Sequence, residues 1–340
     1  MHELTLVIII VLFALTFDFL NGFNDAANSI ATIVATRVLT PFQAVCWAAF
    51  FNFVSAFGFG TAVAKTIAGG MVQPEYVTQM VILTGLVGAI FWTYLASHLG
   101  LPISASHALI GGYGGAAVCK AGLALGWSQA LGILTARNWL LMIAFIFIAP
   151  ILGMLGGGLL MIATTWGFRS QSPQRMDKMF RGMQLLSSAV FSFSHGTNDA
   201  QKTMGIIVGA LFAGGFVETL EVPIWVILAA HTAIALGTLS GGWKVIRTMG
   251  HRLTRLNPLG GFCAETGGAA TVLFAASLGV PASTTHTIAG AIAGVGTVKR
   301  IRAVRWHKAR EIVWAWVITL PTTIAVGATA YLLAHWAGLE

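Results

Sequence analysis

The sequence predicts an all-α polytopic membrane protein made of two inverted-topology repeats. Three observations predict it: an apolar composition, a series of membrane-length apolar runs, and two motifs that each occur twice. Of the 340 residues, 56% are hydrophobic and 9% are charged, whereas a soluble domain carries about 25% charged residues. This number of charged residues is too small to cover a water-facing surface. Most of the surface must therefore face lipid. This composition excludes a soluble enzyme, a disordered chain and a secreted disulfide scaffold.

A helix needs about 20 apolar residues to cross a bilayer. Apolar runs occur at 4–20 continuing into 26–38, 42–69, 78–100, 138–164, 183–213, 223–243, 260–278 and 311–337, with shorter Gly-rich runs at 102–119 and 282–298. The first run leads into Asp18 and Asn21 rather than a small-residue cleavage site, which indicates a retained span. We expect about 10 (8–12) membrane segments, with 78–119 and 260–298 as re-entrant helical hairpins.

Basic residues gather in 167–182, 244–257 and 298–310, which together hold 14 of the 19 Lys and Arg. The positive-inside rule places all three segments in the cytoplasm. We interpret them as solvated loops in preference to lipid- or nucleic-acid-binding segments. The first repeat then spans 1–166 and the second 183–340, joined by 167–182 as a basic cytoplasmic linker, in the plasma (inner) membrane.

The two repeated motifs carry the evidence for internal duplication. Asn21–Ser29 in the first half matches His195–Thr203 in the second, and Leu101–His107 matches Val280–His286. Their order is the same in both halves, which chance does not explain. The basic loops of the second half correspond to first-half loops with few Lys or Arg, so equivalent loops should lie on opposite sides. Each half then has an odd number of crossings, most simply five, and both chain ends lie outside.

Asp25 and Asp199 lie at matched positions inside apolar runs, where an ionisable residue costs about 2.5–3.5 kcal/mol on insertion scales. Each follows an Asn, and a Gly close before it allows the helix to break and free backbone carbonyls. Such oxygens suit Na⁺ or H⁺. The alternative, a polar contact between helices, is disfavoured by the duplication. The predicted cation ligands are Asn24, Asp25, Asn198 and Asp199, with Na⁺ at the two aspartates.

The second motif places a Pro before a Ser/Thr cluster and a His. Pro ends one helix and the cluster opens the next, so hydroxyls and free N–H groups gather at a positive helix end, which binds oxyanions. Pro with a single Ser or Thr cap is also an ordinary helix start, but three hydroxyls, twice, favour an anion site. The predicted anion ligands are Ser104, Ser106, Ser283, Thr284 and Thr285.

Several further polar residues fall within these segments. Lys202 is positioned either to pair with Asp199 or to supply positive charge to the anion. His107 and His286 could donate to the anion or shuttle a proton, but fixing the turn is the favoured role. Further candidates are Ser29, Glu265 and Asp18.

No hydrolase pattern is present: the chain has no G-x-S-x-G, no H-E-x-x-H and no Walker loop. We therefore expect a carrier rather than an enzyme, with no cofactor besides a co-transported cation. An ion channel is less favoured because it needs no pair of inverted, separately ligated half-sites.

The sequence resembles the inorganic phosphate transporter (PiT) family over nearly its whole length. The motifs that carry the resemblance are Asn21–Asn28, Pro102–His107, Phe193–Lys202, Gly261–Glu265 and Pro281–His286. It implies symport of phosphate with Na⁺ or H⁺, an inverted-repeat fold with helical hairpins, and a homodimer. Sulfate carriers occur among relatives, so symport of another oxyanion remains the alternative.

The resemblance also implies roles by position. Asp25, Asn28 and Asp199 would hold the coupling cation. Phosphate would be held by Ser104, Ser106, Gln201, Thr203, Ser283, Thr284 and Thr285. The chain departs from animal members near Lys65, where they carry a functional Glu, and in its short 167–182 linker.

Overall fold

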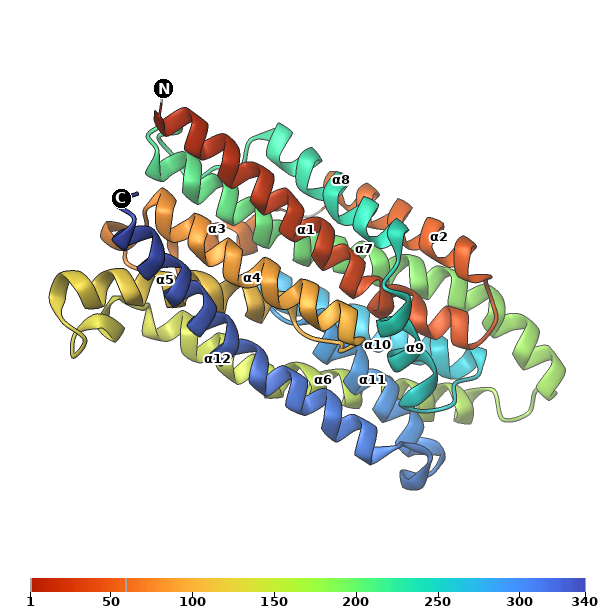
Figure 1. The fold of residues 1–340 in the computed structure, drawn as a ribbon. Helices are drawn as coiled ribbons and strands as arrows, with labels where there is room; N and C mark the ends of the chain where they lie inside the picture. Colours follow the sequence, from red (N-terminus) through yellow and green to blue (C-terminus); the bar gives the residue numbers. More distant parts are fainter. Residues whose placement is uncertain (1, 59, 340) are drawn as a thin grey trace.

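The computed structural model describes residues 2–58 and 60–339, where every regular element is a helix apart from a single bridge between Val72 and Leu134. The first half contains α1 (His2–Ala35), α2 (Pro41–Val54), α3 (Ala62–Gly69), α4 (Gln79–Leu99), α5 (Ala105–Leu125) and α6 (Ala136–Gly167). The second half contains α7 (Pro173–Ala213), α8 (Ile224–Ser240), α9 (Trp243–Arg252), α10 (Pro258–Ser277), α11 (Thr284–Lys299) and α12 (Trp306–Trp336). Figure 1 shows the long helices lying side by side in an elongated bundle.

Side-chain caps and glycine set the ends of several helices. The Thr40 side chain caps α2 in a reciprocal capping box with Gln43. The Ser172 hydroxyl accepts from the backbone of α7, and the Asn257 side chain does the same for α10. Gly100 ends α4 with φ 70°, a left-handed conformation that glycine adopts without strain. The α4–α5 turn is therefore tight, as a helical hairpin requires.

Six helices of the described part are long and apolar enough to cross a membrane: α1, α4, α5, α6, α10 and α12. The count rises to eight if the bent pairs α2–α3 and α8–α9 each form one span. The polar middle of α7 and the 16-residue length of α11 keep these two helices out of that count. An all-α membrane protein is confirmed, while the expected total of about ten segments stays a prediction.

The expected helix break at the Asn-Asp motifs is wrong. Both α1 and α7 run unbroken through Asp25 and Asp199. The preceding glycines serve close packing instead, because a Cβ on Gly22 would lie 2.1 Å from the carbonyl oxygen of Ile234 on α8. A Cβ on Gly196 would likewise meet α2. The breaks occur elsewhere, as bends of 80° between α2 and α3 and 74° between α8 and α9.

The helices α1 and α7 cross the centre of the molecule in opposite directions (Figure 1). As α1 advances, its partners move backward along α7: Asn21 contacts Asp199, Asp25 approaches His195, and Thr36 bonds Gln184. These contacts are polar and buried. A polar seam, defined here as the facing side chains of α1 from Asp18 to Thr36 and of α7 from Gln184 to Thr203, thus runs through an apolar bundle.

One helix of each half packs against a helix of the other half. Helix α5 packs against α12, and α11 packs against α6. Glycines allow both contacts, because a Cβ on Gly115 would lie 2.2 Å from the Ile324 oxygen and one on Gly294 would lie 2.1 Å from the Met154 oxygen. Gly115 and Gly294 are separated along the chain by the same interval as the two copies of the second motif. Each half therefore uses a matched glycine against a helix of the other half.

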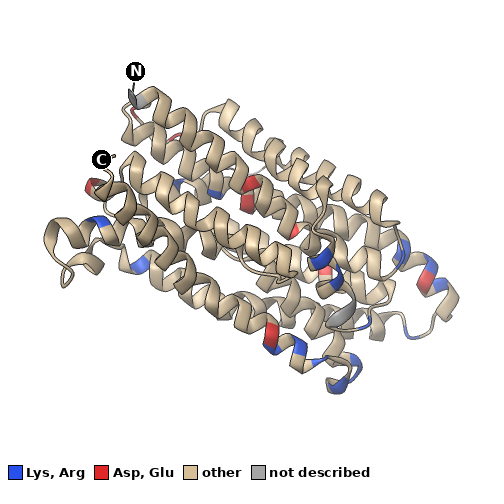
Figure 2. Cartoon of the chain, in the orientation of Figure 1, with Lys and Arg blue, Asp and Glu red and all other residues tan. Residues whose placement is uncertain are grey.

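The three basic segments gather toward one end of the bundle (Figure 2). Hydrogen bonds join two of them directly, since the Arg305 N–H donates to the Leu253 oxygen and the Thr254 hydroxyl donates to the Ala303 oxygen. The third is tied to the end of α1 by Arg181, which donates to the Arg37 carbonyl. One shared basic end is the arrangement that the positive-inside rule requires.

Candidate functional site: two aspartates between facing helix ends

The centre of the polar seam holds three ionisable side chains in close contact. Asp25 on α1 and Asp199 on α7 are each 1% exposed. His195 lies between them, with Nε2 3.6 Å from Asp25 Oδ2 and 3.6 Å from Asp199 Oδ2. Its Nδ1 is 3.2 Å from Asn52 Oδ1 on α2, which orients the ring. Within the described residues these three are the group whose ligand atoms could surround one metal ion, all within 4.8 Å of one another.

Asp25 is bonded to the N-terminus of α11. The Thr284 hydroxyl donates to Asp25 Oδ2 at 3.3 Å, and the Thr285 hydroxyl donates to Oδ1 at 3.2 Å. One turn along α1, the Asn28 amide donates to Thr285 Oγ1 at 2.9 Å. A carboxylate of the first half therefore holds the hydroxyls that open a helix of the second half.

Asp199 is linked to the N-terminus of α5 in a corresponding way, through the ammonium group of Lys202. Lys202 Nζ lies 2.6 Å from Asp199 Oδ1 and also donates to Ser106 Oγ at the start of α5 and to the Ala282 oxygen at 3.1 Å. The Asn198 amide donates to the same carboxylate oxygen at 2.8 Å. Ser106 and Thr285 hold equivalent places in the two copies of the second motif, so the two aspartates reach matched positions of opposite hairpins.

The N-termini of α5 and α11 face each other at this centre. The rings of His107 and His286 lie 5.0 Å apart, and His286 stacks on Trp316 of α12 at 3.9 Å. Ser104 and Ser283 cap the two helices, each accepting from a backbone N–H three residues on. Two positive helix ends thus converge on one buried region, where an anion is favoured.

Buried oxygens suited to a cation line the same region. The side-chain oxygens of Asn21, Asn28 and Asn198 accept no hydrogen bond from any described residue. The same holds for Asn24, whose amide faces α4 and donates to Ser97 Oγ at 2.9 Å. These residues are at most 1% exposed, so water does not satisfy the oxygens from the surface. Amide and carboxylate oxygens together form the ligand set that hard cations prefer. The residues present therefore fit a Na⁺ ion.

Gln201 and Thr203, both predicted as phosphate ligands, have their side chains placed away from this centre. The Gln201 side chain bonds the backbone at the beginning of α3. Its Oε1 accepts from the Val63 N–H at 2.9 Å, and its Nε2 donates to the Gly60 oxygen at 2.7 Å. Thr203 lies beside Asp18, toward the N-terminal end of α1. Ser29 is buried, and its hydroxyl bonds to no described residue.

Glu265 on α10 forms a separate buried site toward the other end of the seam. It accepts from the hydroxyl of Thr32 at 2.6 Å, from the Gln184 amide at 3.0 Å and from the Ser187 hydroxyl at 2.5 Å. These donors come from α1 and α7, so Glu265 ties α10 to both central helices.

His195, Asn21 and Asn52 belong to the centre although the sequence did not single them out as ligands. Asn21 and His195 open the two copies of the first motif, and both contact Asp199. Their matched positions were a usable signal. Asn52 comes from outside both motifs, and nothing in its surroundings along the chain marks it.

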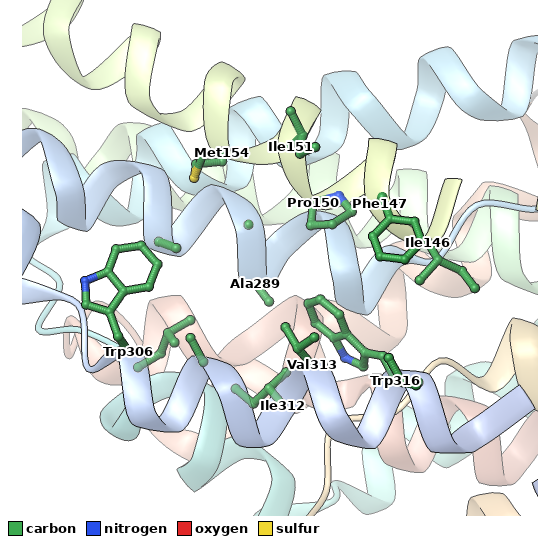
Figure 3. A pocket seen from close by; sticks show the side chains of 15 residues that line it. Ile146, Phe147, Pro150, Ile151, Met154, Ala289, Trp306, Ile312, Val313 and Trp316 are labelled. Carbon is green, nitrogen blue, oxygen red and sulfur yellow. The ribbon is translucent and has the colours of Figure 1, made fainter. Parts of the chain in front are cut away.

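A cavity of about 250 Å³ lies between α6, α11 and α12 (Figure 3). Apolar side chains line it, including Ile146, Phe147, Met154 and Trp306. Trp316 forms its wall toward His286. No charged side chain is among the residues that line this cavity.

Buried carboxylates, an ammonium group and two facing helix ends inside a bundle of membrane-length helices define a membrane transporter, not an enzyme. The chain belongs to the phosphate transporter family, whose model matches residues 21–327. Phosphate is the substrate of that family. The chain is accordingly a multi-pass integral protein of the plasma membrane.

Individual relatives agree with this placement. A chain of Rhizobium meliloti (strain 1021) named a probable low-affinity inorganic phosphate transporter is 49% identical, over 94% of both chains. One of the same name from Bacillus subtilis (strain 168) is 40% identical over 98% of both. A solved structure titled the sodium-dependent phosphate transporter superposes with a TM-score of 0.87 at 26% identity, covering 98% of this chain and 99% of that one.

Proposed function

We propose that the protein imports inorganic phosphate by symport with Na⁺ or H⁺, with phosphate bound between the N-termini of α5 and α11. The observation that carries the proposal is reciprocal: Asp25 bonds the start of α11, and the Asp199–Lys202 pair bonds the start of α5. Cation and anion sites therefore share side chains. Binding of a cation at either carboxylate would free hydroxyls for the phosphate oxygens, which links the two ligands.

The proposed phosphate ligands are the groups at the two helix ends. They are Ser104, Ser106, Lys202, Ser283, Thr284 and Thr285. Gln201 and Thr203 are left out of this set because their side chains lie at α3 and beside Asp18. The proposed cation ligands are Asn24, Asp25, Asn28, Asn198 and Asp199, which supply carboxylate and unpaired amide oxygens.

Energetics support coupling to a cation gradient. Moving a dianion into a cell at about −100 mV costs roughly 4.6 kcal/mol before any concentration gradient. Two monovalent cations only neutralise the dianion, so at least three, or two with a proton already on the phosphate, are needed to use the potential. The sodium-dependent name of the structural relative favours Na⁺ as one of them, and the names of the curated relatives favour a low affinity for phosphate.

We further propose that residues 1–166 and 183–340 are inverted repeats of five segments each, joined by the cytoplasmic linker 167–182. The opposite directions of α1 and α7, and the exchange of α5 and α11 between α12 and α6, support this arrangement. Alternating access would then be a rocking or elevator motion about the repeat interface, and the working unit would be a homodimer in the bilayer.

The test is uptake of radiolabelled phosphate into proteoliposomes with an imposed Na⁺ gradient, an imposed H⁺ gradient or neither. Concentrative uptake with one gradient, undiminished by excess sulfate, is the expected result and names the coupling ion. Sealed vesicles with folded protein that show no gradient-driven phosphate uptake would contradict symport. Competition by sulfate would instead indicate a broader oxyanion carrier.

A further inference from the structure

The apolar cavity between α6, α11 and α12 is open to the outer surface of the bundle. Phe147, Ile151 and Val313 line it and are 60%, 51% and 43% exposed. Helix α11 contributes small residues to the lining, which leaves the space between the larger side chains of α6 and α12; they are Ala289, Gly290 and Ala293. Water does not fill an apolar space of this kind. The apolar molecules that a bilayer offers to fill it are acyl chains.

The cavity extends through the depth of about one leaflet. Along α12 its lining runs from Trp306 to Val317, which is about 16 Å of helix. The hydrocarbon core of a bilayer is about 30 Å thick, so one leaflet accounts for about 15 Å. Figure 3 shows Trp306 at one end of the cavity and Ile146 at the other. One acyl chain can therefore lie along α12 from the basic end of the bundle toward the middle of the membrane.

Basic side chains stand at the end of the cavity that Trp306 marks. This end lies at the N-terminus of α12, in a basic part of the chain (Figure 2). Arg310 is four residues after Trp306 and three before Val313, so it lies on the same side of α12 as these two lining residues. It is exposed, and its guanidinium group takes part in no hydrogen bond or ion pair with another described residue. Arg305 precedes Trp306, and its backbone N–H donates at 3.0 Å to the oxygen of Leu253, a further lining residue.

The chemistry of this end suits the headgroup of an anionic phospholipid. Residues 298–311 contain six Lys or Arg and one acid, Glu311. Guanidinium groups bind phosphate oxygens through two parallel N–H donors. The half-exposed Trp306 is of the residue type that is enriched at the depth of the headgroups. Apolar space and positive charge thus follow each other in the order of the tail and the headgroup of one lipid.

We propose that this cavity binds one anionic phospholipid of the cytoplasmic leaflet, with an acyl chain between α6, α11 and α12 and its phosphate at Arg310 and Arg305. The inference goes beyond the proposed transport and does not depend on it. Part of the segment 298–310, expected from the sequence to be a solvated loop, then binds a ligand. The chain would contact Trp316, whose ring stacks on His286 at 3.9 Å. Bound lipid would therefore hold the start of α11 in place.

The test is native mass spectrometry of the purified protein in detergent, with equal amounts of phosphatidylglycerol and phosphatidylcholine that carry the same acyl chains. Wild type should retain one phosphatidylglycerol in preference to phosphatidylcholine. Arg310→Gln should lower this preference about fivefold, which is the effect of about one basic residue near an anionic membrane surface. Ala293→Phe fills the cavity and should lower the retention of both lipids.

Arg175→Gln is the matched control, because it makes the same change at an exposed arginine of the linker, away from the cavity. It should keep the wild-type preference. Phosphatidylglycerol should also raise the melting temperature of wild type more than that of Arg310→Gln, because a ligand of the folded state stabilises it. Inorganic phosphate should displace no more lipid than sodium chloride of equal ionic strength, because it has no acyl chain to occupy the cavity.

Equal retention of the two lipids by wild type would overturn the proposal, since the cavity would then hold any acyl chain. An equal loss of preference in Arg310→Gln and Arg175→Gln would overturn it as well, because the attraction would belong to the whole basic end. Arg310→Gln changes an exposed side chain, so the test does not depend on whether Ala293→Phe folds.

Discussion

Lys202 is the one buried ammonium group of the polar seam, and it joins the two halves. It pairs with Asp199 on its own helix and bonds Ser106 of the opposite hairpin. Asn28 stands at the matched position of the first half, so the two half-sites differ by one charge. In the proposed mode of binding, Lys202 is the positive group that faces phosphate on the side of α5.

Lys202→Met should reduce phosphate uptake at least tenfold. The substitution keeps the length of the side chain but leaves Asp199 without its ion pair and phosphate without a counter-charge; breaking a buried pair costs about 3–5 kcal/mol. Initial rates of labelled phosphate uptake check this. Lys65→Met removes an exposed lysine and is the control, expected to transport at the wild-type rate. Equal rates in both variants would refute the assignment of Lys202.

Most residues of the centre could be predicted because their motifs occur twice. Repetition distinguished Asp25 and Asp199 from chance polar residues, and it distinguished the Ser/Thr clusters from simple helix caps. Sequence alone could not show which face of α7 each residue occupies. Gln201, two residues from Asp199, points to α3 instead, because successive side chains on a helix turn by about 100°.

At the scale of elements, glycine allows the helices to pack closely rather than to break. The sequence placed breaks at the Asn-Asp motifs, since Gly can disrupt a helix. The structure keeps α1 and α7 continuous and puts Gly22 and Gly196 against neighbouring backbones. Local sequence does not distinguish the two roles, because both need a residue without a Cβ and only the neighbouring helix decides between them.

Gly290→Ala should lower the melting temperature. A Cβ there would lie 2.1 Å from the Pro150 oxygen, so α11 would have to move away from α6. Overpacking of this kind costs about 1–3 kcal/mol. Thermal unfolding of the purified protein in detergent checks the prediction.

Gly182→Ala is the control for that experiment, because nothing lies within 4 Å of its Cβ position on α7. Replacing this glycine reduces the conformational entropy of the unfolded chain, so the melting temperature of Gly182→Ala should be unchanged or slightly higher. A melting temperature for Gly290→Ala equal to that of the control would show that α6 and α11 are not in close contact.

For the whole molecule, the composition and the apolar runs sufficed to predict an all-α membrane protein. The exchange of helices between the halves could not be predicted, because it depends on contacts between segments far apart in the chain. The three basic segments could be recognised in the sequence, and in the folded molecule they cluster at one end. It gives the bundle an inside and an outside although no single helix specifies them.

The orientation can be measured with single cysteines in a background where Cys46, Cys119 and Cys263 are replaced. We expect Ser172→Cys, in the exposed linker, to react with an impermeant thiol reagent only from the cytoplasmic side. Ser128→Cys, exposed between α5 and α6, should react only from outside. Labelling of whole cells against inverted vesicles gives the answer, and reaction of both from one side would contradict a single crossing of the membrane by α6.

We expect Asp25 and Asp199, one from each half, to serve one linked cation and phosphate site. The most direct measurement is phosphate binding to the purified protein by calorimetry, with saturating coupling cation or with choline. Wild type should bind phosphate more tightly with the cation, and Asp25→Asn and Asp199→Asn should each lose that enhancement while remaining folded. Retention of full cation-enhanced binding by either variant would show that the halves do not share a site.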